Sequence, residues 1–163
     1  MRFLSLALVS LVAVAMLATA CGDDDDPDST EPTGDGADAG LGFPLTPPDD
    51  AVTTASGLQY IDLQAGTGPT PTHTTTTSVT VHYRGLLPDG TQFDSSYDRG
   101  TPAEFQLGGV IPGFAEGIAT MNTGGHRVLY IPGELAYGAA GNPRAGIGPN
   151  QPLIFEVELI ASS

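Results

Sequence analysis

The segment VTVHYR (residues 79–84) alternates apolar and polar side chains along its whole length. This two-residue period is that of a β-strand that buries one face. The segment LIFEVEL (residues 153–159) follows the same rule over its second half, where Glu156 and Glu158 alternate with apolar residues. Each segment is therefore expected to be a strand with one face on a hydrophobic core.

Four further strands are expected around these two segments. They are short runs of apolar and polar residues at residues 58–63, 91–94, 104–107 and 127–131. The sequence LPDG at residues 87–90 is a turn that joins two of the strands. Short strands separated by glycine and proline are typical of an antiparallel sheet rather than of a helical bundle.

One segment has helical spacing. Pro112 suits the first turn of a helix, and Phe114, Ile118 and Met121 follow at intervals of four and three residues. The helix is expected to end near Asn122. Because a sheet and a helix with one apolar face each bury those faces against each other, the sequence predicts an α+β fold.

The first twenty residues have the composition of an export signal. A positive start is followed by an apolar run from Leu4 to Leu17, which is too short to span a bilayer comfortably. The stretch LATAC at residues 17–21 resembles the bacterial lipobox, whose cysteine is acylated. Residues 1–20 are therefore expected to be a lipoprotein signal peptide, and Cys21 the lipid anchor of an extracytoplasmic protein of the cell envelope. An ordinary cleavage site with an incidental cysteine, or an uncleaved anchor, is the alternative.

Residues 21–51 are expected to form an acidic, disordered linker after the lipidated cysteine. Ten of the nineteen carboxylates lie between Asp23 and Asp50, in a stretch without Lys or Arg. Such a segment buries too little apolar surface to offset its chain entropy. Calcium capture by these aspartates is an alternative that lacks a complete EF-hand spacing.

The rest of the chain has a mild negative charge, with nine acidic side chains and four arginines from residue 51 onward. A surface of this kind does not neutralise phosphates, so no nucleic acid is expected as a partner. None of the three His, nor the single Cys, has the spacing of a metal-ligand set. No G-x-S-x-G elbow surrounds Ser95 or Ser96. Neither a metal nor a cofactor is therefore expected.

Four longer motifs resemble the FKBP-type peptidyl-prolyl cis/trans isomerases. They are VHYRGLLPDGTQFDSSYDRG (81–100), VIPGFAEGIATMNTGG (110–125), YIPGELAYGAAG (130–141) and PLIFEVEL (152–159), in the order and at the spacing of the family. The resemblance covers residues 56–161 and identifies residues 52–163 as one isomerase domain. It implies a curved antiparallel sheet of five to six strands wrapped around one short α-helix.

The resemblance also implies a site in an aromatic pocket. Tyr83, Asp94, Ile111 and Tyr137 would act on the substrate, with the Ile111 N–H and the Tyr137 hydroxyl donating to its carbonyl groups. The remaining pocket residues would be Phe93, Arg99, Phe105, Val110, Phe114, Ile147 and Phe155. Arg99 would support the Asp94 carboxylate and the Tyr83 phenol.

The activity implied by the resemblance is rotation about X–Pro bonds in exported polypeptides, which assists their folding. Rotation breaks amide resonance, with a barrier of about 18–20 kcal/mol, but it breaks no covalent bond. A dry pocket disfavours the polar planar amide more than the twisted one. Proline-containing polypeptides are the implied partners, and tacrolimus-like macrolides are implied as pocket ligands.

Two other functions are compatible with parts of the sequence. The fold could serve as a chaperone or scaffold module that binds proline-containing chains without catalysis. A hydrolase would use Asp94 with Glu104 or Glu116, but no motif positions a water molecule or a leaving group. An isomerisation assay separates the three functions.

Overall fold

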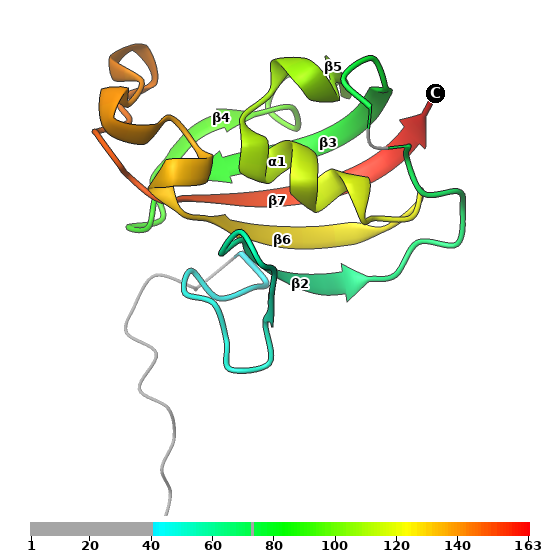
Figure 1. The fold of residues 1–163 in the computed structure, drawn as a ribbon, viewed down its shortest axis with the longest axis horizontal. Coiled ribbons are helices and arrows are strands. Elements are labelled where there is room, and N and C mark those ends of the chain that lie inside the picture. The colour runs from blue at the N-terminus through cyan, green and yellow to red at the C-terminus, as the bar shows by residue number, and fades with distance from the viewer. Residues whose placement is uncertain (1–40, 73) are drawn as a thin grey trace, which may run out of the picture. The chain divides into compact units, whose positions relative to one another are not determined.

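The structure is a computed structural model that describes residues 41–72 and 74–163. Within these residues seven strands form one antiparallel sheet, and the single α-helix α1 (Pro112–Ala119) lies against it (Figure 1). The strands are β1 (Val52–Thr53), β2 (Gln59–Gln64), β3 (Ser78–Leu86), β4 (Gln92–Ser95), β5 (Ala103–Gln106), β6 (His126–Ile131) and β7 (Leu153–Ser162). The predicted α+β fold is confirmed, with the two-residue strand β1 as an addition.

The sheet order brings the site residues together. The strands follow the order β1-β2-β6-β7-β3-β4, and β5 pairs with β3 beside this path. The N-terminal half of β3 pairs with β5, and its C-terminal half pairs with β4. The segment VTVHYR thus lies in the strand that β4, β5 and β7 all contact.

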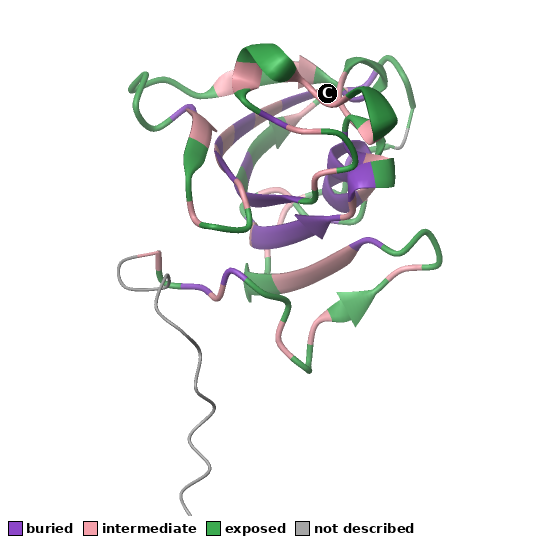
Figure 2. Cartoon of the chain, turned by 90° about the vertical axis from the view of Figure 1, so that its left-hand side faces the viewer, coloured by how far each residue is buried: buried purple, intermediate pink, exposed green. Residues whose placement is uncertain are grey.

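One face of the sheet, here called the inner face, packs against α1. Its core is built from the apolar positions of the alternating strands and from the helix: Val79, Val81, Tyr83, Leu129, Ile131, Leu153, Phe155, Val157, Leu159, Phe114 and Ile118. Each fully buried aliphatic side chain contributes about 1.5–3 kcal/mol through removal from water. Figure 2 shows the helix as largely buried, whereas most loops are half-buried or exposed. The sequence alternation therefore predicts the inner face correctly.

The helix begins as predicted and ends earlier. Pro112 occupies the first turn, where its missing N–H is not needed. The helix ends at Ala119, where Arg127 of β6 donates to the Gly117 carbonyl at 2.9 Å and to the Thr120 hydroxyl at 2.6 Å. The arginine thereby satisfies a carbonyl of the last turn. Met121 lies beyond the helix, although it is buried in the same core.

The opposite face, here called the outer face, carries a second and smaller cluster. Phe43 and Leu45 pack there with residues of β3, β6 and β7: Leu86, Val128, Tyr130 and Ile154. The Tyr130 hydroxyl donates to the Pro44 carbonyl at 2.8 Å. The sequence predicts a linker up to residue 51, but Phe43 and Leu45, within its last eleven residues, pack onto the sheet. Two apolar side chains that cover otherwise exposed sheet residues account for this difference.

The expected signal peptide (residues 1–20), Cys21 and the linker up to residue 40 lie outside the described residues. Among residues 41–72 and 74–163, no helix has the length and apolar character needed to cross a membrane.

Candidate active site

A cavity of about 270 Å³ opens where the start of α1 meets strands β3, β4, β5 and β7. Its lining comes from these elements and from the segment after β6: Tyr83, Phe93, Asp94, Phe105, Gly109, Val110, Ile111, Phe114, Tyr137 and Phe155. Most of these side chains are apolar. A cavity of this kind withdraws a ligand from water while a few polar groups orient it.

The floor of the cavity is a continuous group of aromatic rings. Phe114 and Phe155 lie at its centre, with ring centroids 5.1 Å apart at 67°. Phe105 meets Phe114 edge to face at 6.0 Å, and Phe93 meets Phe155 in the same way at 5.6 Å. Such pairs contribute about 0.5–1.5 kcal/mol each beyond their buried area. The rings therefore fix one another, and a ligand does not have to order them.

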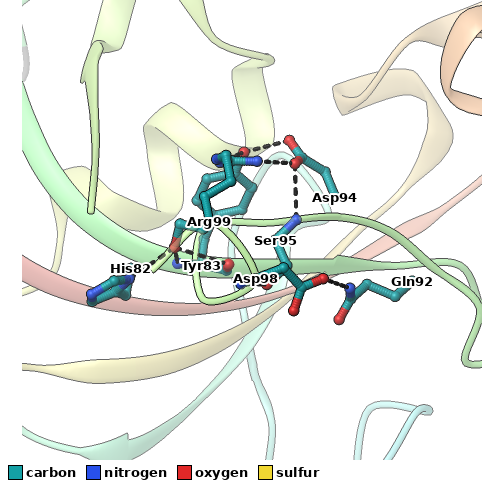
Figure 3. A network of polar contacts seen from close by, with 8 residues as sticks. His82, Tyr83, Gln92, Asp94, Ser95, Asp98 and Arg99 are labelled. Carbon is teal, nitrogen blue, oxygen red and sulfur yellow. Dashed lines mark hydrogen bonds and ion pairs between the residues drawn. The ribbon is translucent and has the colours of Figure 1, made fainter. Parts of the chain in front are cut away.

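A polar network closes one wall of the cavity (Figure 3). Asp94 accepts hydrogen bonds from the Tyr83 hydroxyl, from Arg99 Nη1 at 2.5 Å and from the Ser95 N–H at 2.8 Å. Arg99 Nη2 also donates to the Tyr83 hydroxyl oxygen at 2.9 Å. Tyr83 is thus held from β3, Asp94 from β4, and Arg99 from the turn that follows β4.

The electrostatics of this network favour a neutral phenol and a charged carboxylate. Burial raises the pKa of Tyr83, and its hydrogen bond to Asp94 raises it further against the opposing effect of Arg99. Burial alone would raise the pKa of Asp94, but the bonds from Tyr83, Arg99 and Ser95 outweigh it and lower that pKa. Neither group is poised to exchange a proton near neutral pH, so the network is suited to orienting a ligand.

Two hydrogen-bond donors line the cavity without a partner among the described residues. They are the Tyr137 hydroxyl and the Ile111 N–H. Tyr137 is 37% exposed. Ile111 has an extended backbone as the residue before Pro112, and its carbonyl, but not its N–H, joins the first bonds of α1. These two donors can hold carbonyl groups of a bound chain.

Nine of the eleven predicted pocket residues line the cavity. Arg99 does not line it but bonds to two residues that do. Ile147 is 2% exposed, packs in the core and is not among the residues that line the cavity, so its role in the site stays a prediction. Paired backbone bonds between Asn142 and Ile147, at 2.8 and 3.0 Å, direct it inward. Gly109 lines the cavity unpredicted, since a glycine has no side chain to signal a site.

The two glutamates that a hydrolase would use with Asp94 form hydrogen bonds to serine hydroxyls outside the cavity. Glu104 accepts a bond from the Ser78 hydroxyl at 3.0 Å, and Glu116 accepts from the Ser56 hydroxyl at 2.8 and 2.9 Å. Neither lines the cavity with Asp94. In the described part of the chain, no group of three or more His, Cys, Asp or Glu is arranged to hold a metal ion.

Comparison with known proteins places this geometry in a family. Residues 70–160 match the profile of the FKBP-type peptidyl-prolyl cis-trans isomerases. The FKBP-type peptidyl-prolyl cis-trans isomerase FkpA of Escherichia coli strain K12 is 50% identical over 108 residues, which are 66% of this chain and 38% of that protein. The peptidyl-prolyl cis-trans isomerase Mip of Coxiella burnetii is 51% identical over 109 residues, 67% of this chain and 46% of that protein.

A solved structure shares the fold as well as the sequence. The crystal structure of FkpA from Escherichia coli matches with a TM-score of 0.66 at 46% identity, over 71% of this chain and 53% of that chain. The chain spans less than half the length of the two curated relatives named above. Since the family profile matches more than half of the residues, the chain belongs to the FKBP-type peptidyl-prolyl cis-trans isomerase family.

Proposed function

We propose that the domain catalyses cis/trans rotation about X–Pro bonds in polypeptides. The observation that carries this proposal is a cavity with a floor of mutually packed aromatic rings and two donors in its lining that have no partner in the described part of the chain. A proline ring fits an apolar floor of this kind, and the carbonyl groups beside it need donors. The family relationship supports the same activity.

Desolvation and orientation are the proposed sources of catalysis. The planar amide is stabilised by charge separation, which is lost when the bond twists and the nitrogen lone pair localises. An apolar cavity therefore raises the free energy of the planar form more than that of the twisted form. Each reduction of about 1.4 kcal/mol in the barrier raises the rate tenfold, so a few such contacts suffice.

The polar residues have orienting roles in this proposal. The Ile111 N–H and the Tyr137 hydroxyl hold carbonyl groups of the substrate while the X–Pro bond turns. Asp94 and Arg99 fix the Tyr83 ring as a rigid wall. No proton has to move, which agrees with the charged Asp94 and the neutral Tyr83.

An NMR exchange experiment on a proline-containing tetrapeptide tests the activity. The protein is expected to accelerate the exchange between cis and trans peaks, and tacrolimus is expected to abolish the acceleration by filling the cavity. A protein that binds the peptide without accelerating exchange would instead be a non-catalytic chaperone or scaffold module. Cleavage of the peptide would indicate a hydrolase.

We also propose that the domain works on exported polypeptides from a lipid anchor in the cell envelope. The support is the LATAC stretch at residues 17–21 and the acidic segment that follows it. The anchor and the domain borders at residues 20, 51 and 52 are proposals from sequence. Growth with a fatty-acid analogue is expected to label the wild type and not a Cys21→Ser variant. Label on both proteins, or on neither, would contradict the anchor.

A further inference from the structure

Strand β4 presents two consecutive residues to the cavity. Phe93 and Asp94 both line it, although consecutive side chains of a regular strand point to opposite faces of a sheet. The pairing of β4 with β3 explains this arrangement. Gly85 lies opposite Asp94 and Leu86 lies opposite Gln92, so Phe93 is an extra residue in the register of the two strands. An extra residue of this kind forms a β-bulge, which re-aims a side chain.

The ring of Phe93 lies over a position of β3 that has no side chain. Gly85 is buried and follows Tyr83 by two residues, so it belongs to the inner face. A Cβ atom on Gly85 would lie 2.5 Å from Phe93 Cζ, 2.8 Å from Phe93 Cε2 and 3.1 Å from Phe155 Cε1. Carbon atoms in contact lie about 3.5–4.0 Å apart. The edge-to-face pair of Phe93 and Phe155 therefore uses the volume that a side chain at residue 85 would occupy.

Glycine is needed at this position for space rather than for its backbone. The φ angle of Gly85 is not positive, so an alanine could adopt the same backbone conformation. A glycine inside a strand costs conformational entropy and packs no side chain of its own. The gain that offsets this cost is the room that Gly85 leaves for two rings of the cavity floor.

The substitution Gly85→Ala is expected to displace Phe93 rather than Phe155. Phe155 is 6% exposed, and its ring centroid lies 5.1 Å from that of Phe114 within the inner core. Phe93 is half-buried and would meet the new Cβ with the far end of its side chain. Because β3 lies beneath the ring and Phe155 beside it, the ring is free to move toward the cavity or toward solvent. Either movement changes the floor on which a proline ring would lie.

We propose that Gly85 is a positioning residue of the cavity, because the space above it lets Phe93 lie against β3 while Asp94 holds Tyr83 (Figure 3). This inference rests on the proposed isomerase function and deepens it. Gly85 does not line the cavity, so it acts through the ring of Phe93. A displaced ring competes with the proline ring in the planar and in the twisted state alike, and its main effect is therefore on KM.

The test is NMR exchange on a proline-containing tetrapeptide, with kcat and KM taken from the dependence of the rate on peptide concentration. Gly85→Ala is expected to raise KM by about fivefold or more, the factor that corresponds to the usual cost of overpacking, with a smaller change in kcat. A variant that is merely less stable would lower kcat through a smaller folded fraction and keep the wild-type KM. An unchanged KM in Gly85→Ala would overturn the proposal.

Gly117→Ala is the matched control. Gly117 is a buried glycine of α1, and a Cβ atom there would lie 2.4 Å from Leu129 Cδ2. Neither Gly117 nor Leu129 lines the cavity. The control thus introduces a similar overlap elsewhere in the same core, and its KM is expected to stay within about twofold of the wild-type value. Equal rises of KM in the two variants would overturn the proposal, because an overlap anywhere in the core would then have the same effect.

A double-variant cycle identifies the ring as the affected group. Phe93→Leu removes the ring atoms Cε2 and Cζ that the new Cβ would meet. Phe93→Leu is itself expected to raise KM, but the addition of Gly85→Ala to it is expected to change KM by less than about twofold. A larger further rise would overturn the proposal. If Gly85→Ala or Gly117→Ala does not fold, the comparison of the double variant with Phe93→Leu decides.

A binding measurement separates this inference from the proposed function. The dissociation constant of the same tetrapeptide is measured for each folded variant by 15N–1H chemical-shift titration. If no protein accelerates exchange while Gly85→Ala weakens binding and Gly117→Ala does not, the proposed function fails and the role of Gly85 stands. If the wild type accelerates exchange and Gly85→Ala keeps the wild-type KM and dissociation constant, the role of Gly85 is wrong and the proposed function stands.

Discussion

The two faces of the sheet bury apolar side chains with different results. The inner face packs against α1 and contains the cavity, whereas the outer face is covered in part by Phe43 and Leu45. The eight residues of α1 extend about 12 Å. The nine residues of β3 extend about 30 Å. The helix is therefore too short to cover the inner face along the strands.

The uncovered part of the inner face is where the cavity lies. Phe93, Phe105 and Val110 are half-buried there, beyond the start of the helix, and no further element covers them among the described residues. On the outer face the chain covers its own cluster with a segment that precedes the first strand. The cavity thus lies on the inner face beyond the start of α1. The cluster on the outer face is closed, because the segment with Phe43 and Leu45 packs on it.

The largest expected effect is on the inner core. Ile118 is 0% exposed, and Ile118→Ala is expected to lower the free energy of unfolding by about 2–5 kcal/mol through lost burial and a new cavity. Urea denaturation measures this loss. Ile160→Ala is the matched control, because Ile160 is 40% exposed on β7, and it is expected to change stability by less than about 0.5 kcal/mol. Equal losses would contradict the assignment of the core.

The outer cluster is expected to be less costly to disrupt. Phe43→Ala is expected to lower the free energy of unfolding by about 1–3 kcal/mol, because the segment that carries Phe43 can separate without unfolding the sheet. The kcat/KM for a proline peptide is expected to stay at the wild-type value, since Phe43 lies on the face opposite the cavity. A parallel loss of turnover would show that the two faces are coupled.

The sequence predicts the inner face well because its signals are local and periodic. The alternation of β3 and β7 and the spacing of Phe114 and Ile118 each depend on neighbouring residues alone. The packing of Phe43 is not visible in this way, because acidic, glycine and proline residues surround it. Its partners, such as Tyr130, are far along the chain.

Contacts that no alternating or helical spacing signals accompany the other differences. The last turn of the helix is capped by Arg127, which lies on the strand that follows it. The buried Ile147 exchanges two backbone hydrogen bonds with Asn142, five residues before it. In contrast, Tyr83, Asp94 and Arg99 of the motif VHYRGLLPDGTQFDSSYDRG lie in contact with one another, since a hairpin of fixed register and the turn after it join them.

A third experiment separates the pocket wall from the core. Asp94→Ala removes the acceptor that Tyr83, Arg99 and the Ser95 N–H share. It is expected to lower kcat/KM by about tenfold, equivalent to about 1.4 kcal/mol, while the fold remains intact. Glu104→Gln is the control, because Glu104 is an exposed carboxylate of β5 outside the cavity. The kcat/KM of this control variant is expected to match that of the wild type. Unchanged turnover in Asp94→Ala would remove Asp94 from the site.

The smallest expected effect is the pH dependence of stability that Asp94 contributes. Its hydrogen bonds lower its pKa in the folded protein, so the carboxylate stabilises the fold above its unfolded pKa of about 3.9. This contribution is lost as the pH falls through the lower folded value. It amounts to less than about 1 kcal/mol, because the side chain is 43% exposed and solvent screens its ion pair with Arg99.

Denaturation of the wild type and of Asp94→Asn at a series of pH values measures this contribution. The wild type is expected to be the more stable protein at pH 6, and the difference is expected to shrink as the solution becomes more acidic than about pH 4. High salt is expected to narrow the difference at pH 6, because Arg99 and Asp94 are half-exposed. A difference that grows toward acid would mean that the protonated carboxyl group is the form that the pocket wall stabilises.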